Sequence, residues 1–373
     1  MIDLRKAVVS ALLVAAAGHT APTAAPQVEV IATGLSNPRG IAFSPNGRLY
    51  VAEAGRGGNG NCITVGDGQS ACYGETGAIT LIDPLGVNAP ERVVTGLPSI
   101  APAGGFGAGG PLDISFLGGG NAQVVMGLGA AASARGALGG KSALLGRVLQ
   151  VNAAGGWKTG ADIAAFEEAN NPAGGGTDSN PYGIAALPSR HIVADAGANA
   201  IFEVRTNGQI RTLATFPARP VLAPPFLGLP PGATIPMQAV PTTVVQGPDG
   251  WLYVGQLTGF PFPVGGANIY RVPSQGGMPE VAATGFTNVI DMAFDRYGTL
   301  YVLQIGNGFA GPGGPPLNAP GKLIRVNDDG TQTVIYANLF YPGGLAIGPD
   351  GAAYVTNFGI LPAGGQVLRI MLD

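Results

Sequence analysis

The sequence predicts an all-β fold, a six-bladed β-propeller closed by its own N-terminal strand. One hairpin pattern recurs six times along the chain. A further strand pattern, of the kind that ends most of the repeats, precedes the first hairpin and is missing after the last one. The 63 glycines and 32 prolines of the 373 residues separate runs of Val, Ile, Leu and Tyr, which is typical of turn-rich all-β proteins.

The inner half of each repeat is a strand, a tight turn and a second strand. The turns, such as "SPNG" and "GPDG", are the short Gly/Asn/Asp types that connect hairpins. The six hairpins begin at Asn37 ("NPRGIAFSPNGRLYVAEAG"), Pro111, Asn180, Val240, Val289 and Tyr341 ("YPGGLAIGPDGAAYVTNFG"). The third strands that follow begin at Gly77, Gly146, Asn199, Ala267, Gly321 and Gly365.

The outer half of each repeat ends with a fourth strand. Fourth strands begin at Glu91, near Gly156 in degenerate form, and at Ile210, Pro279 and Thr331. No fourth strand follows the sixth hairpin, but "QVEVIATGL", from Gln27, matches the pattern. We therefore expect this N-terminal strand to complete the last blade, with residues 26–373 forming one domain.

The N-terminus and the cysteines predict export. Arg5 and Lys6 precede an apolar run and small residues, which predicts a cleaved signal peptide within residues 1–25. We expect Cys62 and Cys72, the two cysteines of the chain, to form a disulfide that closes a short loop, and we expect a secreted or periplasmic monomer. No later segment is apolar over the length that a membrane helix needs.

Charge excludes one class of partner. The formal net charge is −3 and the chain has four lysines, so no basic stripe is available to neutralise a phosphate backbone. We expect no nucleic-acid binding.

Loop lengths predict which face of the propeller binds a ligand. The turns within the hairpins and between third and fourth strands are short, whereas every long insertion falls on the opposite face. Loops on a rigid scaffold often carry function, so we expect the long-loop face to bind a small molecule, a glycan or a protein partner. The insertions comprise residues 55–76, 98–110, 129–144, 166–179, 217–239, 257–266 and 306–320.

Two rings of residues are expected at the mouth of the central channel on this face. The first ring lies at the start of the first strands and comprises Arg39, Asp113, Tyr182, Thr242, Asp291 and Gly343. The second ring lies at the end of the second strands and comprises Glu53, Asp195, Gln256, Gln304 and Asn357, with Gly127 and Leu128 in blade two.

The carboxylates of these rings suggest a metal site. Asp113, Asp291, Glu53 and Asp195 could hold a hard cation such as Ca²⁺ through oxygen ligands. The alternative is structural, because Asp and Asn at strand ends commonly accept hydrogen bonds from turn amides, and Arg39 could pair with a carboxylate. His191 is the one histidine outside the predicted signal peptide, and it starts a second strand on the short-turn side. A Ser–His–Asp triad at the mouth is therefore not expected.

The chain resembles the ScyD/ScyE family of exported six-bladed propellers, related by fold to NHL-repeat, strictosidine-synthase-like and gluconolactonase propellers. The resemblance rests on the first and last hairpins and on "GADIAAFEEANNPAGGGTDSNPYGIA", residues 160–185, which contains a short predicted helix with Glu167 and Glu168. The family name implies an association with the biosynthesis of scytonemin, an extracellular pigment. The gluconolactonase likeness implies a Glu/Asn/Asp metal set, which Glu53, Asp195 and Asn357 match loosely.

Three functional hypotheses follow. The first is an exported propeller that binds a partner on its long-loop face. The second is a Ca²⁺-dependent, lactonase-like hydrolase in the channel mouth. The third is a structural extracellular module with no chemistry at the mouth.

Overall fold

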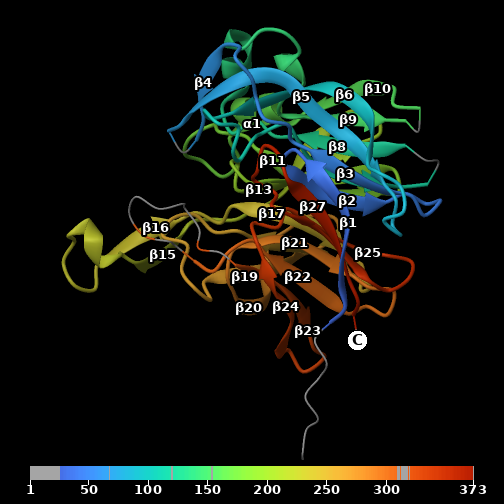
Figure 1. Cartoon of the computed structure of the whole chain (residues 1–373). Coiled ribbons are helices and arrows are strands. Elements are labelled where there is room, and N and C mark those ends of the chain that lie inside the picture. The colour runs from blue at the N-terminus through green and yellow to red at the C-terminus, as the bar shows by residue number, and fades with distance from the viewer. Residues whose placement is uncertain are drawn as a thin grey trace, which may run out of the picture.

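Six β-sheets of four or more strands form the blades of a propeller around a central channel in the computed structural model of the chain. Figure 1 views the molecule from the side, with the N-terminal blades above and the C-terminal blades below. The structure describes residues 26–66, 68–118, 121–152, 154–308, 311, 318 and 320–372. The predicted signal peptide lies outside the described residues.

The first three blades follow the chain from the channel outward. Blade one contains β2 (Pro38–Phe43), β3 (Leu49–Glu53), β5 (Ser70–Ile82) and β6 (Glu91–Ala101), with β4 (Cys62–Thr64) added along β5. Blade two contains β7 (Pro111–Phe116), β8 (Ala122–Met126), β9 (Arg147–Val151) and β10 (Trp157–Asp162). Blade three contains β11 (Pro181–Leu187), β12 (Arg190–Asp195), β13 (Ala200–Arg205) and β14 (Ile210–Thr215).

The last three blades repeat this order. Blade four contains β17 (Pro241–Gln246), β18 (Leu252–Gln256), β19 (Ala267–Val272) and β20 (Glu280–Phe286). Blade five contains β21 (Val289–Phe294), β22 (Leu300–Gln304), β23 (Gly321–Val326) and β24 (Gln332–Leu339). Blade six contains β25 (Gly344–Ile347), β26 (Ala353–Asn357), β27 (Gly365–Ile370) and, as its outermost strand, β1 (Val28–Leu35).

The ring closes as the sequence predicts. The first strands of neighbouring blades contact one another all the way around the channel, including β25 of blade six against β2 of blade one. β1 pairs antiparallel with β27, from Val28 opposite Ile370 to Leu35 opposite Gly365. The predicted closure strand is therefore confirmed, and so is the degenerate fourth strand of blade two, which is β10.

Blade one has longer strands than the sequence predicts. β5 begins at Ser70 rather than Gly77, and β6 continues to Ala101, so parts of two expected loops are strand extensions. β4 pairs with the added length of β5 and places Cys62 directly opposite Cys72. These two residues form the predicted disulfide, with their Cα atoms 4.0 Å apart.

The other insertions also contain regular structure. Residues between β14 and β17 form a hairpin of β15 (Arg219–Leu222) and β16 (Thr234–Met237), with a 3₁₀ turn at Pro225–Leu227, and this hairpin projects from the ring at the left of Figure 1. Between β8 and β9 lie two 3₁₀ turns, Ala132–Ala137 and Ser142–Leu144. The predicted helix is α1 (Ile163–Asn170), whose N-cap Asp162 accepts a hydrogen bond from the Ala165 amide.

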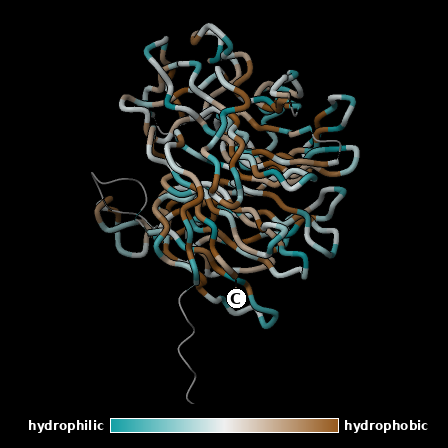
Figure 2. The backbone as a smooth tube through the Cα atoms, turned by 45° about the vertical axis from the view of Figure 1, so that its right-hand side comes forward, coloured by the Kyte–Doolittle hydropathy of each residue, from teal (hydrophilic) through white to brown (hydrophobic). Residues whose placement is uncertain are grey.

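The hydrophobic core lies between adjacent blades. Strand residues alternate between the two faces of each sheet, and both faces are covered by neighbouring blades, so nearly continuous apolar runs are buried. One cluster joins blades six and one through Leu35, Ile41, Leu49, Tyr354 and Val367. In Figure 2, where the backbone is coloured by residue hydropathy, the hydrophobic residues accordingly lie mostly inside the molecule.

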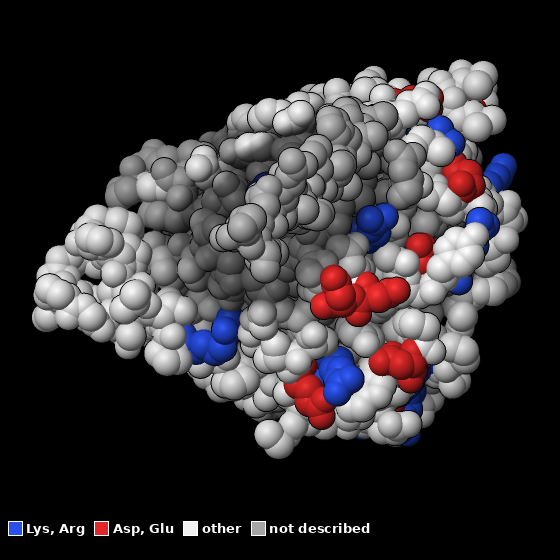
Figure 3. Space-filling model, turned by 90° about the horizontal axis from the view of Figure 1, so that it is seen from below, with Lys and Arg blue, Asp and Glu red and all other residues white. Residues whose placement is uncertain are grey.

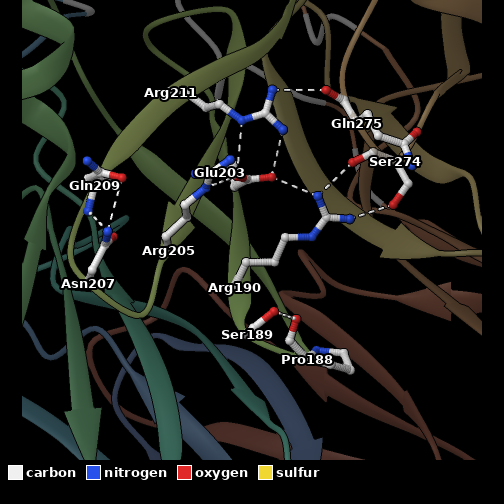
Figure 4. Close-up of polar contacts among 10 residues, drawn as sticks. All are labelled: Pro188, Ser189, Arg190, Glu203, Arg205, Asn207, Gln209, Arg211, Ser274 and Gln275. Atoms are coloured by element: carbon white, nitrogen blue, oxygen red, sulfur yellow. Dashed lines mark hydrogen bonds and ion pairs between the residues drawn. The ribbon is translucent and has the colours of Figure 1, made fainter.

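A cluster of three arginines around Glu203 links blades three and four (Figure 4). Arg211, Arg205 and Arg190 all donate to the Glu203 carboxylate, with N to O distances of 2.7 to 3.0 Å. Arg190 and Arg211 also reach the backbone carbonyls of Ser274 and Gln275 in the next blade. The hydrogen bonds from the arginines, that of Arg211 first, lower the pKa of Glu203 to about 2.

Charged side chains of both signs lie on the face seen from below. On the face seen in Figure 3, acidic and basic side chains lie intermixed. No helix among the described residues is long and apolar enough to cross a membrane.

The closure strand provides the first prediction. Leu35 of β1 is 1% exposed and packs between blades six and one, so Leu35→Ala should cost about 3 kcal/mol of unfolding free energy. Val30 on the same strand is 55% exposed, and Val30→Ala should change stability by less than about 0.5 kcal/mol. Urea denaturation of both variants measures this difference, and equal stabilities would contradict the role given to β1.

Candidate functional site

Irregular pairing at the start of the inner hairpins shapes the channel mouth on the long-loop face. In five of the six blades the pairing between first and second strands shifts register at the first strand's start. Such bulges redirect the side chain of the unpaired residue. Arg39, Leu112 and Tyr182 occupy these places in blades one, two and three, and all three line one cavity.

This mouth cavity has a volume of about 170 Å³. Its walls come from the starts of the first strands and from the long loops. The lining residues are Arg39, Val65, Ala71, Ile100, Pro102, Gly107, Ala108, Gly109, Leu112, Leu128, Gly129, Asn180 and Tyr182. The long-loop face therefore carries a half-open, mainly apolar cavity with one arginine in its wall.

Arg39 is buried in this wall, with 6% of its surface exposed. Its Nη1 donates to the Tyr182 hydroxyl at 3.2 Å, and its Nη2 donates to the Ala108 carbonyl at 3.1 Å. Its Nε has no hydrogen-bond partner among the described residues. The pairing of Arg39 with a carboxylate, which the sequence left open as an alternative, does not occur among these residues.

The other members of the first ring do not share one position. Asp113 and Asp291 lie one place further along the repeat, inside the channel, where they line a cavity of about 340 Å³. Thr242 donates to the Val289 carbonyl of the next blade at 2.8 Å. At Gly343 a side chain would overlap with the backbone at Pro38 and Arg39, so this glycine permits close approach of blades six and one.

The two channel aspartates hold neighbouring blades. Asp113 accepts hydrogen bonds from the amides of Ile114 and Ile184, each at 2.8 Å. Asp291 accepts from the amides of Met292 and Leu345, at 2.8 and 2.7 Å, and from the hydroxyl of Thr243.

Burial and mutual repulsion govern the charge of this pair. Burial and then the negative charge of Asp291 raise the pKa of Asp113 well above its usual range. Burial also raises the pKa of Asp291. The channel therefore favours a protonated carboxyl or a bound cation over two bare charges.

The second ring holds the chain segments that lead into the blades. Glu53 accepts from the Ser36 amide at 2.6 Å and pairs with Arg92 at 2.8 Å. Asp195 accepts from the Asn180 amide, Gln256 donates to the Ala239 carbonyl, and Asn357 accepts from the Phe340 amide. Gln304 is buried at the equivalent place in blade five.

Two asparagines that the sequence reading did not select fix the long loops. Asn37 and Asn288 immediately precede the first strands β2 and β21. Their φ angles are 48° and 49°, a left-handed conformation that asparagine tolerates better than most residues. Asn37 donates to the carbonyls of Gly55 and Gly105 at 2.6 and 2.8 Å, and Asn288 donates to that of Leu257 at 2.9 Å. The sequence contained one signal for this role, which is that an asparagine recurs directly before the first strand of a blade.

The four candidate metal ligands are not brought together as a set. Glu53 is held by Arg92 and Asp195 by Ser179, whereas Asp113 and Asp291 face the channel. Within the described part of the chain, no group of three or more His, Cys, Asp or Glu side chains is placed to hold a metal ion.

A separate group of acids lies behind the mouth. Glu167 of α1 is 1% exposed, and its Oε2 has no hydrogen-bond partner among the described residues. Burial and the charges of Asp195, Asp178 and Glu168 raise the pKa of Glu167 to about 7. Burial and Asp195 likewise raise the pKa of Asp178 to about 6. Burial beside other acids therefore favours the protonated forms of Glu167 and Asp178.

The short-turn face also has a cavity, of about 720 Å³, between the turns of blades one, five and six. The exposed Arg296 and Tyr297 form part of its wall. His191 lies at the start of β12, as the sequence predicts, and burial lowers its pKa.

One solved structure supports the fold, and two others show a weaker likeness. A Bacteroides thetaiotaomicron protein of unknown function has a similar structure, with a TM-score of 0.55 and 9% identity over 94% of this chain and 76% of that chain. A streptogramin B lyase has a TM-score of 0.49 and 14% identity, covering 92% of this chain and 98% of its own. A provisionally assigned gluconolactonase has a TM-score of 0.47 and 12% identity, covering 94% and 96%.

Sequence comparison adds no family. No protein-family model matches the chain, and no curated protein matches it. The structure itself shows the six-bladed propeller, whereas no comparison confirms the ScyD/ScyE resemblance.

The raised pKa of Glu167 gives a pH-dependent prediction. A carboxyl whose pKa is higher in the folded protein than in the unfolded chain stabilises the fold below the unfolded value, about 4.3, and loses that contribution as the pH rises through the folded value, about 7. Glu167→Gln mimics the protonated acid. It should therefore match the wild type near pH 4 and exceed its stability by about 1–2 kcal/mol at pH 8, a value reduced for solvent screening.

Denaturation at both pH values tests this expectation. Glu168→Gln is the matched control. Glu168 accepts hydrogen bonds from the Ser133 amide and hydroxyl, so this substitution should lower the stability of the protein. A Glu167→Gln variant that is no more stable than the wild type at pH 8 would contradict the assignment.

Proposed function

We propose that this chain is an exported propeller that binds a small molecule in the mouth cavity of its long-loop face. The observation that carries the proposal is the buried guanidinium of Arg39, which lies in the wall of a mainly apolar cavity without a carboxylate partner among the described residues. A mostly apolar cleft or cavity with a few convergent polar groups is the usual form of a ligand site.

Export is supported by two features. Cys62 and Cys72 form a disulfide, which is typical of proteins outside the reducing cytosol. Residues 1–25 have the sequence pattern of a signal peptide. A secreted or periplasmic location fits both.

A small molecule fits the mouth better than a glycan or a protein. The cavity is smaller than the roughly 300–1,000 Å³ of sites for drug-sized ligands. A larger partner would instead occupy an open groove of about 770 Å³ on the same face, which includes Arg56 and shares Pro102 with the cavity wall. That groove lacks a buried unpaired charge among its lining residues.

A cavity-filling variant tests the proposal. Ala71 lines the cavity, whereas Ser70 beside it is exposed, so Ala71→Leu should fill the site and Ser70→Leu should not. In ligand-observed NMR with a mixed panel of charged and neutral fragments of about six to nine heavy atoms, we expect some fragments to bind the wild type and Ser70→Leu but not Ala71→Leu. Equal binding to both variants, or no binding to the wild type, would refute the proposal.

A Ca²⁺-dependent, lactonase-like hydrolase is the alternative. Its support is the pair of buried channel carboxylates, Asp113 and Asp291, whose negative charges a cation would offset. Both would supply oxygen ligands, and a bound calcium would polarise a lactone carbonyl.

Calcium titration separates the two functions. On the leading proposal, calcium leaves the melting temperature of the wild type unchanged. A calcium-dependent rise in the wild type that disappears in the double variant Asp113→Asn plus Asp291→Asn would favour the hydrolase.

A further inference from the structure

No described residue places a negative charge on the Arg39 guanidinium in the mouth cavity. The two acceptors that Arg39 reaches, the Tyr182 hydroxyl and the Ala108 carbonyl, are both neutral. Asp113 lies on the first strand of the neighbouring blade, but its carboxylate accepts hydrogen bonds from the amides of Ile114 and Ile184. A buried charge normally has a partner of opposite sign, because removal from water is costly. The cavity therefore favours an anion beside Arg39.

Two polar groups in the wall have donors to offer beside the charge of Arg39. The Arg39 Nε has no partner among the described residues but is itself buried, so the guanidinium acts on a ligand chiefly through its positive charge. The Tyr182 hydroxyl accepts from Arg39 and has no acceptor for its own hydrogen among the described residues, so that hydrogen is available. The Asn180 side chain accepts from the Leu128 amide through Oδ1, and no described residue accepts from its Nδ2. All three residues line the same cavity.

The rest of the wall is apolar. Val65, Ile100, Pro102, Leu112 and Leu128 provide its side chains, and glycine and alanine residues provide most of the remainder. The volume of about 170 Å³ is close to that of a cavity of about 150 Å³ that holds benzene in another protein. A ligand of this size has room for one small apolar group and one polar end.

From these observations we propose that the ligand is a small monocarboxylate, with its carboxylate on Arg39 and Tyr182 and its apolar part against Ile100, Leu112 and Leu128. This rests on the proposed function, since it assigns a ligand class to the same cavity. A single arginine matches a single negative charge, whereas a phosphate dianion would leave one charge unpaired. A neutral molecule of the same shape would leave the guanidinium without a counter-charge, so the cavity should discriminate against it.

Benzoate and 3-methylbutanoate are the probes, and benzamide and 3-methylbutanamide are their neutral counterparts. Binding is measured by ligand-observed NMR titration in a buffer without carboxylate ions. The wild type should bind the carboxylates at least tenfold more tightly than the amides, the ratio expected for hydrogen bonds to a charged group.

Variants assign the discrimination to named groups. Arg39→Gln should remove the preference for carboxylates, while Arg56→Gln, which changes an exposed arginine on the same face, should keep it. Tyr182→Phe keeps the ring that packs against the core and removes the hydroxyl, so carboxylate affinity should fall about three- to tenfold. Because Arg39→Gln could disturb the fold, Tyr182→Phe and a melting curve for each variant keep the result interpretable.

The outcomes separate this inference from the proposed function. If amides and carboxylates bind equally and Arg39→Gln changes neither, the carboxylate assignment is overturned, but binding that Ala71→Leu abolishes would still support the cavity as a site. If no carboxylate binds while a neutral fragment binds in an Ala71-dependent way, the assignment is again overturned. If nothing binds the wild type, both proposals fail.

Discussion

The pairing of β1 with β27 is the constraint on which the rest of the structure depends. Six sheets arranged in a circle need a link between the first and last blades, and here the N-terminal strand provides it as the outer strand of blade six. The same strand ends at Leu35, four residues before Arg39, and the Asn37 amide donates to the Leu361 carbonyl of blade six. Closure therefore also fixes the backbone that carries the buried arginine.

Polar side chains around the mouth serve two purposes that sequence alone does not separate. Glu53, Asp195 and Asn357 accept hydrogen bonds from the amides of incoming connections, which would otherwise be buried without partners. Arg39 uses two of its donors on neutral acceptors, and its positive charge has no carboxylate partner among the described residues. The first kind of polarity stabilises the ring, and the second is what a ligand would satisfy.

The irregular start of the first strands gives the mouth its composition. A bulge frees one residue per hairpin from the sheet's alternation, so Arg39, Leu112 and Tyr182 from three successive blades meet at one cavity. The next position along the repeat faces the channel, and there Asp113 and Asp291 bind the backbone of neighbouring blades. Side chains at the second position of the first strands therefore line the mouth cavity, whereas the aspartates at the third position join neighbouring blades.

The sequence by itself determined the fold and much of its detail. The repeated hairpins, the displaced strand before Asn37 and the paired cysteines each depend on local patterns that recur or have few alternatives, and the structure confirms all three. It also placed Arg39 and Tyr182 at the mouth, although the ring was read with Asp113 and Asp291 in the wrong register. A bulge leaves no clear mark in sequence, because it changes pairing rather than residue type.

Only the tertiary structure decided what each polar residue contacts. The sequence showed four carboxylates that could share a cation. In the structure Glu53 instead pairs with Arg92, which lies 39 positions along the chain and is brought close by strand pairing. Likewise, the absence of a carboxylate beside Arg39 in the described part of the chain follows from how three blades meet, not from its neighbours in the sequence. Contacts between distant segments are set by packing, and the burial that gives an unpaired charge its energetic weight exists only after the ring has closed.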